Sequence, residues 1–308
     1  GAITPAVGSV VLNNTNLVKD TDYTVSYTTN TNAGTATVTV TGMGNYTGTA
    51  STTFTIEKAT PVVAAPTAKE LTYSGQAQEL VNPGSTTGGT MQYSTLADGS
   101  YGADIPEATD AGTYTVWYKV VGGDNYLDTE PRSVTVTIDK ADPTAEIPSV
   151  NADYGQTLQD IDLPDGWAWE EESASVGDAG TRRHNAIFTP EDTDNYNIVT
   201  REIAVNVAQV TLKIVSVDAT DRVYDGTNQV NITGVTLNGI LNADDVAVEI
   251  SANKPLIGTL ESTNVGSYTK VQLQAQDLVL TGADAGNYNL AVASYETTDV
   301  TITKAEAY

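Results

Sequence analysis

The sequence is very poor in cysteine and histidine, the side chains that serve most often in nucleophilic catalysis and zinc binding. There is no cysteine and a single histidine, His184. Cysteine nucleophiles, disulfides and thiolate metal sites are therefore excluded, as are zinc sites built on several imidazoles. His184 follows two arginines, and no nucleophile or orienting carboxylate stands beside it in a pattern typical of a catalytic triad. The sequence also lacks a phosphate-binding glycine loop and a nucleophile elbow, so we expect a protein that is not an enzyme.

Two tryptophans form the most suggestive binding pattern. Trp167 and Trp169 flank Ala168, so in an extended strand both indoles project from one face, and Glu170-Glu171-Glu172 follows them. Paired exposed indoles beside carboxylates are typical of a stacking platform for a carbohydrate. The alternative is that both rings form the core of a segment otherwise poor in large apolar side chains. Exposure of Trp167, Trp169 or Trp117 distinguishes the two interpretations.

Acidic clusters raise the possibility of calcium, which takes about six to eight oxygen ligands. The clusters are Asp20 with Asp22, Glu191 with Asp192 and Asp194, and Asp244 with Asp245. None has the spacing of an EF-hand loop, and solvated turn residues are the simpler interpretation. We therefore expect no cofactor, with calcium that stiffens interdomain joints as the alternative.

The charge balance excludes several classes of partner. The 308 residues carry 14 basic and 39 acidic side chains, for a formal net charge of −25. Nucleic acids and anionic membrane surfaces are both recognised by cationic side chains, so neither is an expected partner. No apolar stretch reaches the roughly 18 residues of a membrane span, and no signal-peptide pattern is found. The charge favours a soluble monomer.

A pattern that recurs four times defines the organisation of the chain. Each copy has a small residue, a glycine and a hydroxyl residue at the start of a strand, and an Asn-Tyr pair downstream. The first motif stands at Ala33-Gly34-Thr35, Ala111-Gly112-Thr113, Ala179-Gly180-Thr181 and Val265-Gly266-Ser267. The second stands at Asn45-Tyr46, Asn125-Tyr126, Asn195-Tyr196 and Asn287-Tyr288. We divide the chain accordingly into repeats one to four, residues 1–58, 59–140, 141–208 and 209–308.

A tyrosine–glycine turn stands near the start of three repeats. These turns are Tyr73-Ser74-Gly75, Tyr154-Gly155 and Tyr224-Asp225-Gly226. Repeat one has no such turn, so we expect it to be truncated and to lack its opening strand. An aromatic ring beside an amide is able to contact sugars, but a structural role is the better prediction for both tyrosine motifs. Glycine permits positive φ, asparagine bonds its own backbone in a turn, and the tyrosine ring packs beneath it.

Apolar residues alternate within each repeat, as in strands with one buried face. Tyr114, Val116, Tyr118 and Val120, for example, share one face of a strand in repeat two. Sixteen tyrosines and recurrent threonine and valine favour β-structure, and no segment has a sustained helical period. The predicted fold class is all-β: four tandem small immunoglobulin-like β-sandwiches in an extended array. Lys-Ala steps stand at Lys58-Ala59 and Lys140-Ala141, and the prolines just after them (Pro61, Pro66, Pro143 and Pro148) predict short, semi-rigid joints.

The order of these motifs resembles the immunoglobulin-like repeats of large bacterial cell-surface proteins. Repeat three, with Tyr154-Gly155-Gln156, resembles the MBG domains of the YGX type. Repeat four, with Val223-Tyr224-Asp225-Gly226-Thr227, resembles the YDG domains. Repeat one, through Gly44-Asn45-Tyr46-Thr47-Gly48, resembles another class of bacterial surface repeat.

The resemblance implies an extracellular location at a bacterial cell surface, with signal peptide and anchor outside this sequence. It implies a non-catalytic spacer or stalk whose partners are the neighbouring repeats of the same chain. The alternative is an adhesin module that binds a surface glycan or a host protein, through Trp167 and Trp169 if these are exposed. No catalytic residue is carried over by the resemblance. An isopeptide crosslink through Lys58, Lys140 or Lys304 is disfavoured, because each of these lysines lies at a domain junction.

Overall fold

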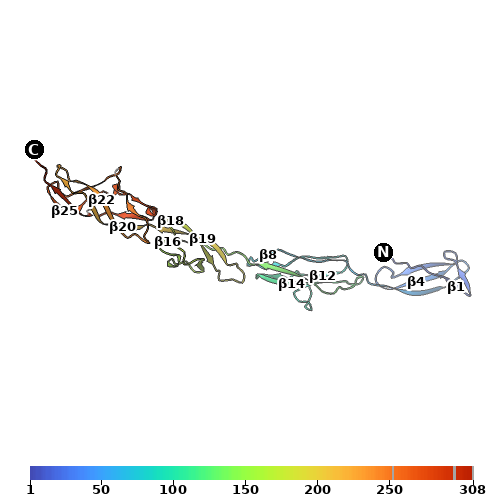
Figure 1. Cartoon of the computed structure of the whole chain (residues 1–308). Helices are drawn as coiled ribbons and strands as arrows, with labels where there is room; N and C mark the ends of the chain where they lie inside the picture. The colour runs from blue at the N-terminus through green and yellow to red at the C-terminus, as the bar shows by residue number, and fades with distance from the viewer. Residues whose placement is uncertain (252, 294–295, 307–308) are drawn as a thin grey trace. The chain divides into compact units, whose positions relative to one another are not determined.

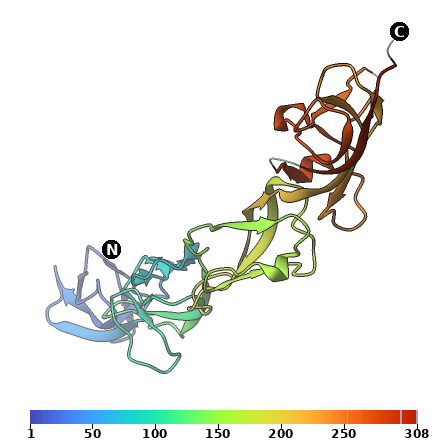
Figure 2. The same ribbon diagram turned by 90° about the vertical axis from the view of Figure 1, so that its left-hand side faces the viewer.

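The computed structural model describes residues 1–251, 253–293 and 296–306, and strands are the main regular structure in them (Figure 1, Figure 2). Within these ranges the helices are short 3-10 turns at Leu158–Asp160, Ala275–Asp277 and Ala285–Asn287. None of the helices in these ranges has the length and apolar character needed to cross a membrane. The predicted all-β fold class is confirmed. Two compact units are described separately: Gly1–Ala141 with Asp194–Tyr196, and Asp142–Thr193 with Asn197–Tyr308.

Repeat one, in the first unit, is a small antiparallel sheet. Its strands lie in the order β3 (Tyr23–Thr28), β4 (Gly34–Gly42) and β5 (Thr49–Ile56), beside a hairpin of β1 (Val10–Leu12) and β2 (Thr15–Leu17). Tyr23 and Ala36 are its buried apolar side chains. Threonine fills much of β4 and β5, which explains why this repeat buries so little apolar surface.

Repeat two, also in the first unit, packs a four-stranded sheet against short strand pairs. The sheet order is β12 (Thr90–Ser94), β14 (Gly112–Val121), β15 (Arg132–Asp139) and β8 (Leu71–Thr72). The pairs are β6 (Val63–Ala64) with β11 (Ser85–Thr86), β7 (Thr67–Ala68) with β10 (Val81–Asn82), and β9 (Gln78–Glu79) with β13 (Glu107–Ala108). Leu80 and Val81 meet Val116, Tyr118 and Val136 of the sheet in the core. The predicted alternation along β14 is confirmed, since Val116, Tyr118 and Val120 are buried.

Repeat three, in the second unit, has one sheet, and loops cover its apolar face. The order is β16 (Ser149–Asp153), β19 (Val199–Ala208), β18 (Gly180–Phe188) and β17 (Trp167–Trp169). Leu158 and Val176, which lie outside these strands, pack on Trp169, Ile203 and Val205. The alternating pattern of the strands indicates a buried face, but it does not specify whether strands or loops cover that face.

Repeat four is a two-sheet sandwich. One sheet has the order β24 (Leu256–Thr259), β22 (Gln229–Asn238), β20 (Val210–Ala219) and β27 (Tyr288–Ala291). The other has the order β21 (Arg222–Val223), β28 (Glu296–Thr303) and β25 (Gly266–Val271), and β23 (Ala247–Val248) pairs with β26 (Leu280–Thr281). Val217, Ile232 and Leu256 of the first sheet share a core with Val271 and Ile302 of the second.

One three-strand ladder is common to repeats two, three and four. The last strand of each of these repeats pairs with two others. It is parallel to the strand before the tyrosine turn and antiparallel to the strand that begins at the glycine step. The ladders are β8-β15-β14, β16-β19-β18 and β21-β28-β25. In repeats two and three the glycine step begins β14 or β18 and the Asn-Tyr pair follows soon after that strand ends, so the two motifs lie at opposite ends of it.

Candidate functional site

The asparagine of the Asn-Tyr pair binds a turn of the preceding repeat. In the first unit Asn125 Oδ1 accepts a hydrogen bond from the Ala33 backbone N–H at 2.8 Å, and its Nδ2 donates to Asn32 Oδ1 at 3.2 Å. In the second unit Asn287 Oδ1 accepts from the Ala179 N–H at 2.8 Å. Its Nδ2 donates to Asp178 Oδ1 at 3.2 Å. We call this two-bond contact the Asn clamp.

A third Asn clamp lies within the first unit. Asn195 Oδ1 accepts from the Ala111 N–H at 2.7 Å, and its Nδ2 lies 3.5 Å from Asp110 Oδ1. The side-chain amides of these asparagines thus bind a turn of another repeat, a partner that the prediction of a bond to the local backbone did not include. A primary amide offers a donor and an acceptor together, which matches an N–H next to a side-chain oxygen. The sequence signal for this partner is the Asn or Asp that precedes the small residue and the glycine of the first motif. An argument that considers only the asparagine's own turn does not detect it.

The tyrosines of the two tyrosine motifs meet at the same joints. The rings of Tyr73 and Tyr196 lie 5.2 Å apart, and those of Tyr154 and Tyr288 lie 5.6 Å apart, both edge to face. Edge-to-face pairs add about 0.5–1.5 kcal/mol beyond the area that they bury. The tyrosine of the tyrosine–glycine turn in one repeat thus packs edge to face against the tyrosine of the Asn-Tyr pair in the next repeat.

The linkers between repeats are bonded to the Asn-Tyr turns. The Ala59 N–H donates to the Asn125 carbonyl at 2.9 Å, and the Ala141 N–H donates to the Asn195 carbonyl at 3.0 Å. In repeat four, β20 pairs in parallel with β27, which begins at Tyr288. Lys58 Nζ donates to the Gly123 carbonyl at 2.6 Å. All three joints therefore combine an Asn clamp with a linker bonded to the Asn-Tyr turn, and the joints of repeats two with three and three with four add a tyrosine pair.

An acidic side chain completes the joint of the second unit. Asp244 Oδ2 accepts hydrogen bonds from the hydroxyls of Tyr154 at 2.9 Å and Tyr288 at 2.5 Å. Burial, followed by this hydrogen bond, raises the pKa of Tyr154 to about 12. Burial also raises the pKa of Tyr288. Leu241 packs over Gly155, where φ is +93° and a Cβ would lie 2.6 Å from Leu241 Cδ1, so this turn requires glycine.

The raised pKa of Tyr154 predicts a loss of stability at alkaline pH. Its phenol keeps its proton in the folded state, whereas in the unfolded chain it ionises near the ordinary tyrosine pKa of 10.0. The stabilisation is therefore complete below about pH 10 and is lost as the pH rises towards 12. Absorbance at 295 nm should show Tyr154 ionising after most other tyrosines, and Tyr154→Phe should remove that late step. Ionisation of Tyr154 together with the exposed tyrosines would contradict the prediction.

Carboxylates in two of the three predicted calcium clusters accept hydrogen bonds from the protein itself. Asp22 Oδ2 accepts from the Val18 N–H at 2.8 Å, Asp244 binds the two tyrosines, and Asp245 Oδ2 accepts from the Ala283 N–H at 3.0 Å. Among the residues that the structure describes, no group of three or more His, Cys, Asp or Glu side chains is placed to hold a metal ion. Calcium binding stays an untested alternative.

The two tryptophans share one sheet face, and Trp169 belongs to the core of repeat three. Trp169 is 7% exposed, its Nε1 donates to the Ile161 carbonyl at 3.0 Å, and its ring meets His184 edge to face at 6.4 Å. Trp167 is half-buried beside Phe188, at 5.1 Å between ring centroids. Trp117 is half-buried on β14. Of the predicted pair, Trp167 alone keeps an accessible edge, so an open platform of two indoles is not formed.

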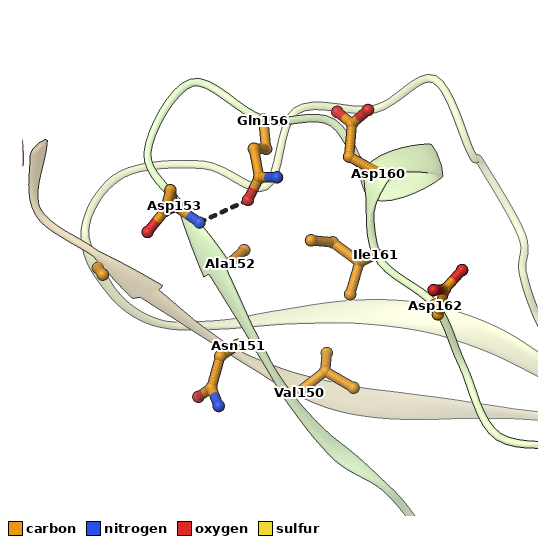
Figure 3. Close-up of a pocket in the computed structure, with 9 residues that line it drawn as sticks. Val150, Asn151, Ala152, Asp153, Gln156, Asp160, Ile161 and Asp162 are labelled. Carbon is orange, nitrogen blue, oxygen red and sulfur yellow. Dashed lines mark hydrogen bonds between the residues drawn. The ribbon is translucent and has the colours of Figure 1, made fainter.

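Open hollows lie on the same repeat. The hollow in Figure 3 is lined by Asn151 of β16, by Gln156 in the segment that follows β16, and by Asp160 at the end of the 3-10 turn Leu158–Asp160, among others. The Asp153 N–H donates to Gln156 Oε1 at 2.6 Å (Figure 3). Asp160 accepts from the N–H and hydroxyl of Thr157, and these bonds lower its pKa. The polar groups at this hollow thus serve the local turn.

The tyrosine turn of repeat four has a local structural role at Asp225. Asp225 Oδ1 accepts from the N–H and the hydroxyl of Thr227, each at 2.8 Å, and from Arg222 Nη1 at 2.6 Å. These bonds, those to Thr227 first, lower the pKa of the Asp225 carboxyl. The turn is thus closed by its own aspartate.

Comparison with known proteins gives one family match. Residues 208–299 match the family model of the YDG domain, in agreement with the resemblance of repeat four. No curated protein matches the chain. The MBG resemblance of repeat three stays a prediction.

Several solved structures align with long stretches of the chain at low identity. Drosophila N-cadherin EC1-4 is 10% identical over 88% of this chain and 83% of its own, with a TM-score of 0.23. Protocadherin Gamma B2 extracellular cadherin domains 3-6 are 11% identical over 89% and 84%, with a TM-score of 0.23. The Bacteroides ovatus protein SGBP-B of a mixed-linkage glucan utilization locus, in complex with a heptasaccharide, is 13% identical over 80% and 71%, with a TM-score of 0.18. Scores of this size are too low to transfer function.

Proposed function

We propose that this chain is a non-catalytic spacer region of a secreted or cell-wall-attached bacterial surface protein. The observation that carries the proposal is the Asn clamp, which recurs with the same atoms at Asn125, Asn195 and Asn287. The recurring sequence motifs of this chain form the contacts between repeats, as expected of a protein whose role is to connect. The YDG match of repeat four supports the proposal, because the motifs of this repeat resemble those of bacterial surface proteins.

The strands that join successive clamps explain how such a spacer would bear load. β4 has 9 residues, β14 has 10 and β18 has 9, so each spans about 30 Å. Each begins at a clamped turn and ends before the asparagine of its own repeat. A pulling force would therefore pass along one strand and across a clamp to the next repeat. Further repeats add length without a new core, because each contacts only its neighbours.

Small-angle X-ray scattering on the full chain tests the spacer. Four domains end to end, each about 35 Å long, would give a rod of roughly 140 Å with a radius of gyration near 40 Å. A compact body of this length would have a radius of gyration of about 19 Å. The expected result is the larger value, unchanged between about 0.15 M and 0.5 M salt, because charge repulsion is screened at the higher salt. A value near 19 Å would overturn the spacer and favour a binding cleft shared by the repeats.

The adhesin alternative now depends on Trp167. Its half-buried indole lines a hollow together with Gln159, Asp162 and Glu172, which offers an aromatic edge and polar groups to a sugar. A variant Trp167→Ala that remains folded while losing binding to a polysaccharide would favour this alternative over a pure spacer.

A further inference from the structure

The sheet of repeat three has a free edge at β16. This strand pairs in parallel with β19 on one side, and none of the described strands pairs with its other side. The strands at the same position in repeats two and four, β8 and β21, have 2 residues each, whereas β16 has 5. An unpaired edge is a template for a further strand, and very short edge strands are one way in which proteins avoid such pairing. Repeat three lacks that protection.

Unpaired backbone groups face outwards along this edge. The Tyr154 N–H donates to the Ala208 carbonyl, on the β19 side. Successive residues of a strand direct their backbone groups alternately to its two sides, so those of Asp153 and Asn151 face the free edge. The Asp153 groups are taken up by the turn that follows. The Asn151 N–H and carbonyl have no hydrogen-bond partner on this side in the part of the chain that the structure describes.

The contact at Asp153 shows what the edge accepts. The Asp153 N–H donates to the side-chain carbonyl of Gln156 at 2.6 Å, and the Asp153 carbonyl accepts from the Gln156 backbone N–H at 3.2 Å. One residue thus supplies an acceptor and a donor in the place where the peptide groups of a neighbouring strand would lie (Figure 3). The same pair of bonds is open at Asn151. Such main-chain bonds provide the affinity when a peptide adds a strand to a sheet.

A hollow beside the edge gives an added strand room. It has a volume of about 490 Å³, and Val150 and Ala152 line it on the core side. Figure 3 shows Ile161 pointing towards β16 from the facing segment. Because side chains of a strand alternate between its two faces, every second side chain of an added strand would lie against these apolar groups.

The rim of the hollow is acidic. Asp153, Asp160 and Asp162 line it, and no lysine, arginine or histidine is among its lining residues. None of the three carboxylates forms an ion pair with a described residue. Charge complementarity therefore favours an occupant whose remaining side chains are basic.

We propose that the free edge of β16 binds an extended segment of a partner protein, with lysine or arginine at alternate positions, as an additional strand. The Asn151 N–H would donate to a carbonyl of this segment, and the Asn151 carbonyl would accept from one of its N–H groups. Apolar side chains would lie on Ile161, and basic side chains would lie near the three aspartates. This binding role goes beyond the proposed spacer and rests on contacts within repeat three alone.

Nuclear magnetic resonance of the full ¹⁵N-labelled chain with the peptide acetyl-Lys-Val-Lys-Val-Lys-amide tests the proposal. We expect saturable shifts centred on the Asn151 backbone amide, with a dissociation constant on the order of 1 mM. The formal net charge of −25 would also attract a basic peptide to other places on the chain. Shifts spread over the acidic surface, without saturation at Asn151, would overturn the proposal.

Modified peptides separate strand addition from charge attraction. One version is methylated at the backbone nitrogens of its lysines only, and another at those of its valines only, so their charges are equal. Alternate N–H groups of a strand point to opposite sides, so just one version blocks the groups that face β16. One version should therefore bind and the other should not, and equal behaviour of the two would contradict strand addition. A third version, with glutamate in place of lysine, should not bind, and binding equal to that of the parent would refute the basic occupant.

Two substitutions of one residue test the contact from the side of the protein. Asn151→Pro removes the N–H at the edge and leaves the bonds to β19, because proline is tolerated in edge strands. It should abolish the shifts of the Ala152 and Ile161 amides. Asn151→Ala keeps the backbone N–H and should bind as wild type does. Wild-type affinity of a folded Asn151→Pro chain, verified by circular dichroism, would place the peptide elsewhere, and the methylated peptides decide the question if this variant does not fold.

Discussion

Trp169→Ala is expected to lower the free energy of unfolding of repeat three by about 3–5 kcal/mol. Trp169 is 7% exposed and packs in the core with Leu158, Val176 and Ile203. The substitution leaves a cavity in a repeat whose single sheet is covered only by loops. It also leaves the Ile161 carbonyl without its indole donor. Urea unfolding followed by far-ultraviolet circular dichroism measures the change.

Two variants control for this prediction. Trp169→Phe keeps an aromatic ring but removes the indole N–H, so it should cost far less than alanine. Trp167→Ala removes a half-buried ring beside Phe188 and should also cost less than Trp169→Ala. If Trp169→Ala lost under about 1 kcal/mol, Trp169 would not be a core residue, and the paired-indole platform would return as an interpretation.

The sequence predicts which face of each strand is buried. It does not predict which segments of the chain pack on that face. Period-two alternation identified the buried face of β14 because side chains of a strand point alternately to its two sides. In repeat three the same logic placed both tryptophans on one face. The loops around Leu158 and Val176 that cover this face have no periodicity, so pattern reasoning does not detect them.

The partners of the Asn clamps could not be predicted from the sequence, for a different reason. Their partners lie 92, 84 and 108 residues away in the chain, whereas an asparagine near a glycine is ordinarily assigned to its own turn. A signal nevertheless exists in hindsight. Asn32, Asp110, Asp178 and Asn264 each precede a small–glycine step, and each supplies a side-chain oxygen where an amide N–H would need one.

Asn287→Ala is expected to lower the free energy of unfolding of the second unit by about 1–3 kcal/mol. Asn287 is 4% exposed, so the substitution leaves the Ala179 N–H without its acceptor at a half-buried position. It also removes the donor to Asp178 Oδ1. The matched control is Asn45→Ala, the same change at an exposed Asn-Tyr pair, which should stay within about 0.5 kcal/mol of wild type. Urea unfolding monitored by circular dichroism compares the two.

A reciprocal exchange separates the clamp from mere burial. Asn287→Asp replaces the amide donor with a carboxylate 3.2 Å from Asp178, so the two negative charges should repel and the unit should lose stability. Adding Asp178→Asn restores a donor and an acceptor in the opposite order. The double variant should therefore recover most of the lost stability. Recovery would show that the paired amide and carboxylate hold the joint, whereas equal stability of the single and double variants would mean that shape alone joins repeat four to repeat three.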